Sequence, residues 1–254
     1  MSASTFEHDE FVVIYGVSWD AYEKILSALG ENHLRHTYDR GALEMRSVIH
    51  GISWDQYQAF LAALQDHSVR HSYVRGTLEM MTPSRDHDWT KSLIGRFIET
   101  MAYELDLRIQ SVGSTTLQKM ALERGVQPDE SYYVANEPLV RARLKLDPEA
   151  DPPPDLIIEV DITNSCLNRL EIFAAIGISE LWRHDGKQLV FYGLSESGKY
   201  AILDRSRAFP WLISSDVQQF VSQIESSDET SLARAFAKHA KNLHEAYSRD
   251  QQPQ

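Results

Sequence analysis

Residues 152–162 read PPPDLIIEVDI, an apolar run that a single glutamate interrupts before a closing aspartate. A continuous apolar run after a proline cluster is typical of a buried central strand. Side chains alternate along a strand, so Glu159 and Asp161 share one face, and Ile158 and Val160 share the other. A carboxylate in such a strand costs several kcal/mol unless it is paired, protonated or metal-bound. The sequence therefore singles out Glu159 as a functional acid, with a structural ion pair as the alternative.

A second acid lies upstream, in VQPDESYYV at residues 126–134. Asp129 follows a proline and begins another predicted strand; the alternative is an ordinary turn residue. Two carboxylates from neighbouring strands suit Mg²⁺, which takes oxygen ligands at about 2.0–2.1 Å. A metal there would polarise a scissile phosphate and activate a bound water. Asp161 is either a further ligand or a cap for the turn toward Thr163 and Asn164.

The elements around these two acids alternate between strands and helices. Helices are expected at about 88–105 and 168–175, the second ending at Gly177, and strands near 108–112, 115–120, SELWRH and KQLVFYGLS. This order predicts an α/β or α+β domain with a mixed sheet. From Asp216 onward the chain is predicted to be a helical tail.

The N-terminal part of the chain is duplicated. Residues 15–45 match residues 50–80 at a constant offset of 35; for example, Trp19 matches Trp54. Each copy predicts a strand, a capped helix and a hairpin, and two copies are too few for a solenoid. The predicted organisation is a first repeat copy at 1–48, a main domain at 49–215 whose first part, 49–81, is the second copy, and the tail at 216–254.

Bulk composition excludes several classes of protein. The single cysteine, Cys166, rules out an intrachain disulfide and a multi-cysteine zinc site. A net charge of −12 counts against a general nucleic-acid binder, although metal-binding carboxylates contribute to that sum. No stretch approaches the ~18 apolar residues of a membrane span, so a soluble, cytoplasmic protein is expected. No phosphate-binding loop or Gly-x-Ser-x-Gly elbow is present.

Five segments carry a family resemblance in combination: LEMMTPSRDH, GSTTLQKMALERGVQPDESYYV, PPPDLIIEVDIT, RLEIFAAIGISELWRHDGKQLVFYGL and SRAFPWL. They resemble the Uma-type putative restriction endonucleases, a bacterial family with the PD-(D/E)xK fold. The resemblance runs from about Gly51 to the C-terminal region. It implies a restriction-endonuclease-like mixed sheet flanked by helices, with the first thirty to forty residues as an extra copy of the family's N-terminal element.

Carried over residue by residue, the resemblance implies that Asp129 is the PD aspartate and Glu159 the second metal ligand. The superfamily pattern has lysine two residues after that glutamate, where this chain has Asp161. In the family the basic residue looks to have moved to the following helix, which here gives Arg169, four residues before Phe173. Arginine suits support of phosphate charge but is a poor proton-transfer group, so the general base stays open.

Three further residues are candidates for supporting roles. His87 leads a helix, where it either touches phosphate or a metal-bound water or makes only a local hydrogen bond. Lys119 is a fallback cation for substrate binding. Glu79 is a candidate third acid, although its repeat at Glu44 weakens a unique role.

The leading hypothesis is an endonuclease that hydrolyses DNA phosphodiester bonds with Mg²⁺, or Mn²⁺ in its place. A homodimer is expected by analogy, since double-strand cutting needs two active sites. One alternative is a catalytically inactive nuclease-fold module for binding or assembly, favoured by the acidic charge, the arginine in place of lysine and the duplication. Another is a non-nuclease metal hydrolase that uses the same acids.

Overall fold

The computed structural model describes residues 11–30, 36–64, 69–82, 84–143, 145–148, 150–161 and 167–251. The chain divides into two compact units. The first unit comprises Met1–Pro83, Lys119–Val126 and Ser165–Leu167, and the second comprises Ser84–Gln118, Gln127–Asn164 and Asn168–Gln254. Cys166 and the turn residues Thr163 and Asn164 lie outside the described residues. The domain boundaries drawn from the sequence stay a prediction.

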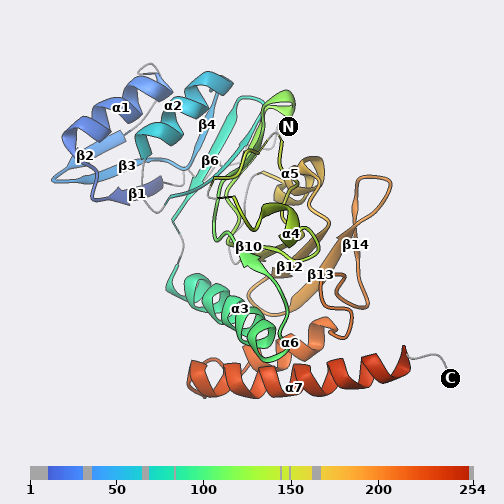
Figure 1. Ribbon diagram of the computed structural model, residues 1–254. Coiled ribbons are helices and arrows are strands. Elements are labelled where there is room, and N and C mark those ends of the chain that lie inside the picture. The colour runs from blue at the N-terminus through green and yellow to red at the C-terminus, as the bar shows by residue number, and fades with distance from the viewer. Residues whose placement is uncertain are drawn as a thin grey trace, which may run out of the picture. The chain divides into compact units, whose positions relative to one another are not determined.

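The first unit contains the duplication (Figure 1, blue to cyan). The first copy consists of β1 (Phe11–Tyr15), α1 (Trp19–Leu29), β2 (His36–Asp39) and β3 (Ala42–Arg46). The second copy consists of β4 (Val48–His50), α2 (Trp54–Leu64), β5 (Arg70–Val74) and β6 (Thr77–Met81). Each copy is therefore the strand-helix-hairpin element that the repeat predicts.

The two copies build separate sheets with matching strand orders. The first copy gives β1-β3-β2, and the second gives β4-β6-β5, which continues through β9 (Arg124–Val126) and β8 (Leu117–Lys119). A short 3₁₀ turn, η1 (Met120–Leu122), joins β8 to β9. The hairpins of the two copies differ in their neighbours: β5 pairs with β9 on its outer side, whereas among the described residues β2 is the last strand of its sheet.

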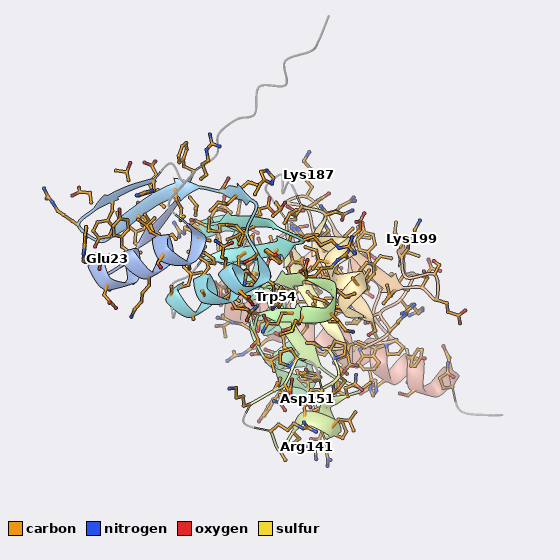
Figure 2. All side chains as sticks on the ribbon, turned by 90° about the horizontal axis from the view of Figure 1, so that it is seen from above. Glu23, Trp54, Arg141, Asp151, Lys187 and Lys199 are labelled. Carbon is orange, nitrogen blue, oxygen red and sulfur yellow. The ribbon has the colours of Figure 1, made fainter. Side chains whose placement is uncertain are left out.

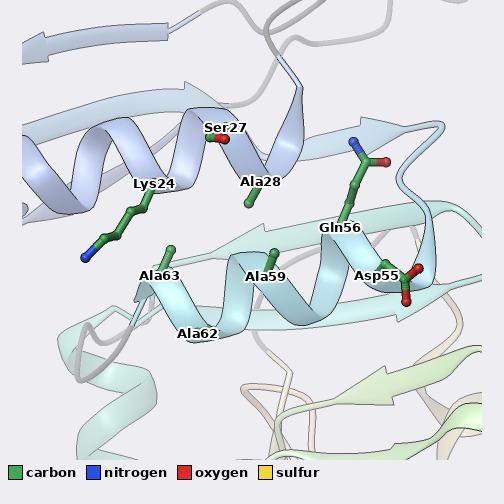
Figure 3. Close-up of a pocket in the computed structure, with 8 residues that line it drawn as sticks. All are labelled: Lys24, Ser27, Ala28, Asp55, Gln56, Ala59, Ala62 and Ala63. Atoms are coloured by element: carbon green, nitrogen blue, oxygen red, sulfur yellow. The ribbon is translucent and has the colours of Figure 1, made fainter.

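Sequence-local signals start the two repeat helices. The Ser18 hydroxyl accepts a hydrogen bond from the Ala21 amide, and the Ser53 hydroxyl accepts one from the Gln56 amide. α1 packs against α2, and small side chains such as Ala28 line the groove between them (Figure 3). One apolar core then runs through both copies.

The second unit is built on a six-stranded mixed sheet. Its order is β14 (Tyr200–Ile202), β13 (Leu189–Leu194), β12 (Glu180–His184), β11 (Leu156–Val160), β10 (Glu130–Tyr133) and β7 (Gln110–Ser111). Only β11 and β12 run parallel; the other neighbours are antiparallel. The crossover between the parallel pair contains α5 (Arg169–Ile176), which ends at the left-handed Gly177. This α+β architecture confirms the expected fold class.

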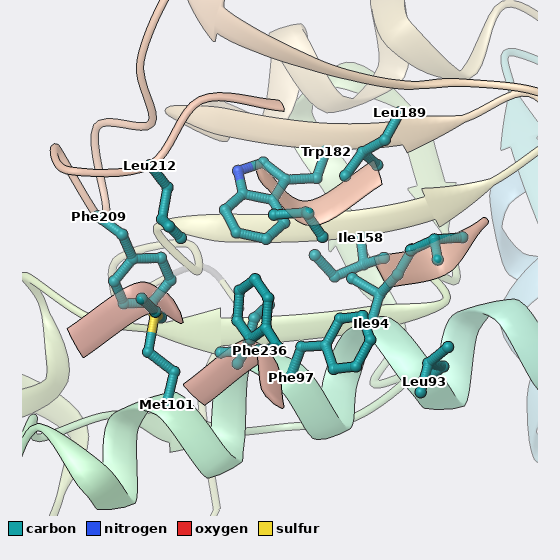
Figure 4. Close-up of a cluster of buried hydrophobic side chains, with 14 of the residues drawn as sticks. Leu93, Ile94, Phe97, Met101, Ile158, Trp182, Leu189, Phe209, Leu212 and Phe236 are labelled. Carbon is teal, nitrogen blue, oxygen red and sulfur yellow. The ribbon is translucent and has the colours of Figure 1, made fainter. Parts of the chain in front are cut away.

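Three helices cover the apolar face of this sheet. α3 (Arg85–Glu104) contacts β11, α6 (Ser214–Val221) contacts β13, and α7 (Glu229–Asp250) packs along α3 (Figure 1). A short α4 (Glu137–Val140) follows β10. Figure 4 shows Ile158, Trp182 and Phe97 together in the core that these elements enclose. Because Ile158 faces this core, alternation turns its neighbour Glu159 to the opposite face.

The two hairpin turns that flank β13, one at each end of this strand, are polar. Lys187 lies in the turn between β12 and β13, and Lys199 precedes β14 (Figure 2). In the part of the chain that the structure describes, no helix has the length and apolar character needed to cross a membrane.

Candidate active site

Asp129 and Glu159 face each other across adjacent strands of the second unit. β10 pairs antiparallel with β11, with Glu130 opposite Ile158, so Asp129 continues the register opposite Glu159. The Asp129 amide donates a hydrogen bond of 3.2 Å to Glu159 Oε1, and the Val160 amide donates one of 2.6 Å to Asp129 Oδ2. Asp129 is 0% exposed and Glu159 is 5% exposed. Two buried acids thus meet where the sequence expects them.

Arg169 closes the site from the start of α5. Its Nε donates to Glu159 Oε2 and its Nη2 donates to Glu159 Oε1, each at 2.9 Å. Nη2 also donates to the Gln127 carbonyl at 2.8 Å, and the guanidinium carbon lies 5.6 Å from the centre of the Phe173 ring. Such a bidentate pair offsets both buried charges and fixes the orientation of the carboxylate.

His87 approaches Asp129 from the first turn of α3. Ser84 caps this helix by accepting a hydrogen bond from the His87 amide. The His87 side chain is buried, and its Nε2 lies 2.8 Å from Asp129 Oδ2, while its Nδ1 lies 3.3 Å from Asp88 Oδ1. The histidine is therefore in direct contact with the candidate aspartate, and its predicted contact with a phosphate stays a prediction.

Two other acids of this region are engaged in different contacts. Asp161 Oδ2 accepts a hydrogen bond of 2.7 Å from Arg183 Nη2. Asp155 lies in the turn that enters β11, where its carboxylate accepts hydrogen bonds from the Val134 and Asn136 amides. Asp155 thus supports the loop after β10, and the pairing with Arg183 gives Asp161 a structural partner.

The remaining predicted site residues belong to the first unit. Glu79 lies on β6 opposite Val48 and Ser72 and is 5% exposed. Lys119 is the last residue of β8. Their predicted roles, a third acid and a fallback cation, stay predictions.

The donor chemistry of the site fits a hard divalent cation. Two carboxylates and the Gln127 carbonyl converge there, and oxygen donors of this kind suit Mg²⁺ and Mn²⁺. Over the residues that the structure describes, no group of three or more His, Cys, Asp or Glu side chains is arranged to hold a metal ion. Arg169 already donates to both oxygens of Glu159, so a cation on this carboxylate would share these oxygens with the guanidinium or displace it.

Glu180 is a buried acid that sequence reasoning did not single out. It is 0% exposed, and burial raises the pKa of its carboxyl group, a shift that hydrogen bonds from Ala208, Trp182, Ser206 and Arg207 oppose. These partners tie the segment after β14 to β12. Glu180 shows that a buried acid can be structural, so burial alone does not mark the site.

His184, at the end of β12, makes stability depend on pH. Burial lowers its pKa below the usual 6.5, an effect that outweighs the nearby charge of Asp185, and its Nδ1 accepts a hydrogen bond from the Gly186 amide. Below pH 6.5 the unfolded chain binds this proton more readily than the folded chain does. The stabilisation from the neutral ring is therefore present above pH 6.5 and lost as the pH falls through the folded-state pKa.

We expect His184→Gln to flatten this dependence, because glutamine keeps an acceptor for the Gly186 amide and does not titrate. Urea unfolding of both proteins between pH 7.5 and pH 5 measures the difference. If the free energy of unfolding changed equally with pH in the wild type and the variant, His184 would not be a source of the pH dependence.

The chain was compared with known proteins. A family model described as "Uma2: Putative restriction endonuclease" matches residues 54–225, more than half of the chain. Among solved structures, a putative nuclease belonging to DUF820 from Anabaena variabilis ATCC 29413 matches with 13% sequence identity and a TM-score of 0.41. That match covers 53% of this chain and 76% of the other. No curated protein matches the chain.

Two contacts of the site had no clear signal in the sequence. The Gln127 carbonyl accepts from Arg169, and a backbone acceptor cannot be read from residue type. The contact of His87 with Asp129 joins residues 42 positions apart. Only the place of His87 at the start of a predicted helix marked it as a candidate.

Proposed function

Because the chain belongs to the Uma2 family of putative restriction endonucleases, we propose that it hydrolyses phosphodiester bonds of DNA with a divalent metal ion. The family and the restriction-endonuclease-like α+β fold class expected from the sequence are both confirmed. The proposal rests on one observation above all. Asp129 and Glu159 are buried side by side on adjacent strands, with a guanidinium against the second.

Asp129 and Glu159 would hold the metal, with Mg²⁺ or Mn²⁺ as the candidates. Bound there, the ion would supply Lewis-acid activation of the phosphate and of an attacking water. One oxygen of Asp161 already accepts a hydrogen bond from Arg183, so we assign this residue a lesser role as a ligand.

The basic and imidazole groups would position these acids. Arg169 would orient the Glu159 carboxylate through its two hydrogen bonds, and the planar donors of a guanidinium also suit the charge that develops on a phosphate. His87 would position Asp129 through the contact of its Nε2 with Asp129 Oδ2. Glu79 and Lys119 are kept as candidates for acid assistance and substrate binding, and a homodimer would provide the two centres needed to cut both strands.

A second candidate function has a specific observation in its favour. The bidentate Arg169–Glu159 pair satisfies both buried charges without a metal. In a nuclease fold that has lost catalysis and serves in binding or assembly, this ion pair alone would compensate the buried charge of Glu159. The two functions differ in whether divalent metal enters the site.

Supercoiled plasmid incubated with the purified full chain tests the proposal. We expect nicked and linear products with Mg²⁺ or Mn²⁺ and none with EDTA, because removing the cation removes the activated water. Calorimetric titration with Mn²⁺ gives a second readout. Intact plasmid under all metal conditions, together with no measurable Mn²⁺ binding, would favour the inactive module. A chain that cleaved only small phosphodiesters would point to a different metal hydrolase.

A further inference from the structure

The two repeat copies carry the same aromatic cluster. In each copy a helix tyrosine stacks on a hairpin tyrosine, with ring centres 4.6 Å apart for Tyr22 and Tyr38 and 4.5 Å apart for Tyr57 and Tyr73. Each hairpin tyrosine donates a 2.9 Å hydrogen bond to the carbonyl 21 residues earlier. The hairpins also share their register, shifted by the 35-residue offset. Contacts made by one copy therefore indicate what the other copy can accommodate.

In the second copy, β9 covers the outer edge of β5. The two strands are antiparallel, with Tyr73 opposite Gly125. Val74 lies opposite Arg124 in the same ladder. A Cβ atom on Gly125 would lie 2.3 Å from the Tyr57 hydroxyl, so glycine alone fits over the stacked rings. Both tyrosines are fully buried. The stacked tyrosine pair of the second copy thus packs against an extended strand that has a glycine opposite Tyr73.

In the first copy, the equivalent platform, the stacked pair of Tyr22 and Tyr38, is only partly buried. β2 is the last strand of its sheet, and within the described part of the chain no strand pairs with its outer edge. Tyr22 and Tyr38 are partly buried, and Trp19 is 59% exposed. An edge strand beside partly exposed aromatic rings presents backbone donors and acceptors together with a stacking surface. The first copy has the features that hold β9 in the second copy.

We propose that the outer edge of β2 binds an extended segment of a partner protein, antiparallel to β2, with a glycine opposite Tyr38. The partner adds a strand to the sheet, as β9 does on β5. In this mode of recognition the main-chain ladder provides affinity, and the side-chain positions provide specificity. This inference does not depend on the proposed nuclease function.

Charge defines a second position of the partner. The 35-residue offset places Asp39 where the second copy has Val74, opposite Arg124 of β9. The partner therefore carries a basic residue directly before its glycine. Asp39 is exposed, and its contact with Arg40, at 3.6 Å, is a solvent-screened surface pair that can yield to a cross-strand partner.

Self-pairing of β2 in a second copy of the chain fits this platform less well. β2 reads HTYD and has no glycine. An antiparallel β2 from another copy would place a side chain over the rings at the position that Gly125 occupies in the second repeat. A basic residue followed by glycine, as in the Arg124-Gly125 pair, fits both the ring pair and Asp39.

The probe is the peptide KMALERGVQ, which is residues 119–127 of this chain and contains β9. Added to the isotope-labelled full chain, it is expected to cause saturable amide shifts at Thr37–Asp39. Alanine in place of Gly125 in the peptide should weaken binding by about 10-fold or more, the equivalent of losing one well-packed contact. Asp39→Lys in the protein should weaken binding of KMALERGVQ, and a peptide with glutamate in place of Arg124 should restore it. A scrambled peptide is the control.

Four results would overturn the proposal. The first is the absence of amide shifts up to millimolar peptide, and the second is equal affinity of the glycine and alanine peptides. The third is that the glutamate peptide does not bind the Asp39→Lys protein more tightly than KMALERGVQ does. The fourth is a set of shifts at Ser72–Val74, which would mean that the peptide only displaces the chain's own β9. Sedimentation velocity of the free chain tests whether a second copy of the chain occupies this edge instead. A dimer that Asp39→Lys dissociates and the peptide cannot displace would assign this edge to a second copy.

Discussion

Asp129→Asn is expected to lower the rate of metal-dependent DNA cleavage by more than about 100-fold, since even residues behind the ligands of metal sites cost about 10–100-fold when changed. Asparagine has the shape of aspartate and keeps an acceptor for the Val160 amide. It has no negative charge with which to hold a divalent cation. Plasmid cleavage and Mn²⁺ titration should therefore fall together while the fold is retained.

Glu196→Gln is the matched control for this variant. It removes one negative charge from an exposed turn, so both activity and Mn²⁺ affinity should remain at the wild-type level. A wild-type cleavage rate for Asp129→Asn would show that the aspartate is a structural turn residue. A variant that binds Mn²⁺ normally and does not cleave would remove Asp129 from the ligand set and leave it a role in chemistry.

Arg169→Met is expected to lower the free energy of unfolding of the second unit by about 3–5 kcal/mol, the usual cost of breaking a buried ion pair. Methionine fills a similar volume but leaves the Glu159 carboxylate, which is 5% exposed, without its guanidinium. Urea unfolding in EDTA measures this effect apart from any metal binding.

The double variant Glu159→Gln with Arg169→Met separates charge from packing. With both charges removed, a large part of the lost stability should return, because the cost of the single change is mainly that of an isolated buried charge. Arg183→Met serves as a comparison, since its pair with Asp161 is partly exposed and should cost less. Wild-type stability of Arg169→Met, or a double variant no more stable than the single one, would contradict this account.

Local sequence signals predicted most of the secondary structure of the second unit. The apolar run before Val160 is the central strand β11, and Gly177 ends α5 in the left-handed conformation. The 35-residue repeat predicted two strand-helix-hairpin copies, and both are present. These features depend on periodicity, capping and turn chemistry, which act between residues close together in the chain.

The site was predicted less evenly. Glu159 could be singled out because a carboxylate in a buried strand is costly wherever the strand lies. Strand alternation predicted Asp161 on the same face as Glu159. It could not predict that Arg183, from the neighbouring strand β12, would donate a hydrogen bond to Asp161. Glu180 was overlooked because two of its partners are the backbone amides of Arg207 and Ala208, which lie 27 and 28 residues away.

By itself, the sequence determined which residues form β11, that Glu159 turns away from the apolar core, and that the N-terminal element occurs twice. Tertiary structure decided that Asp129 lies opposite Glu159. It likewise decided that Arg169 donates two hydrogen bonds to the glutamate and that His87 contacts the aspartate. It also decided that β5 is covered by β9. The reason is physical: alternation and capping depend on neighbouring residues, whereas strand register and helix docking depend on how distant apolar faces pack.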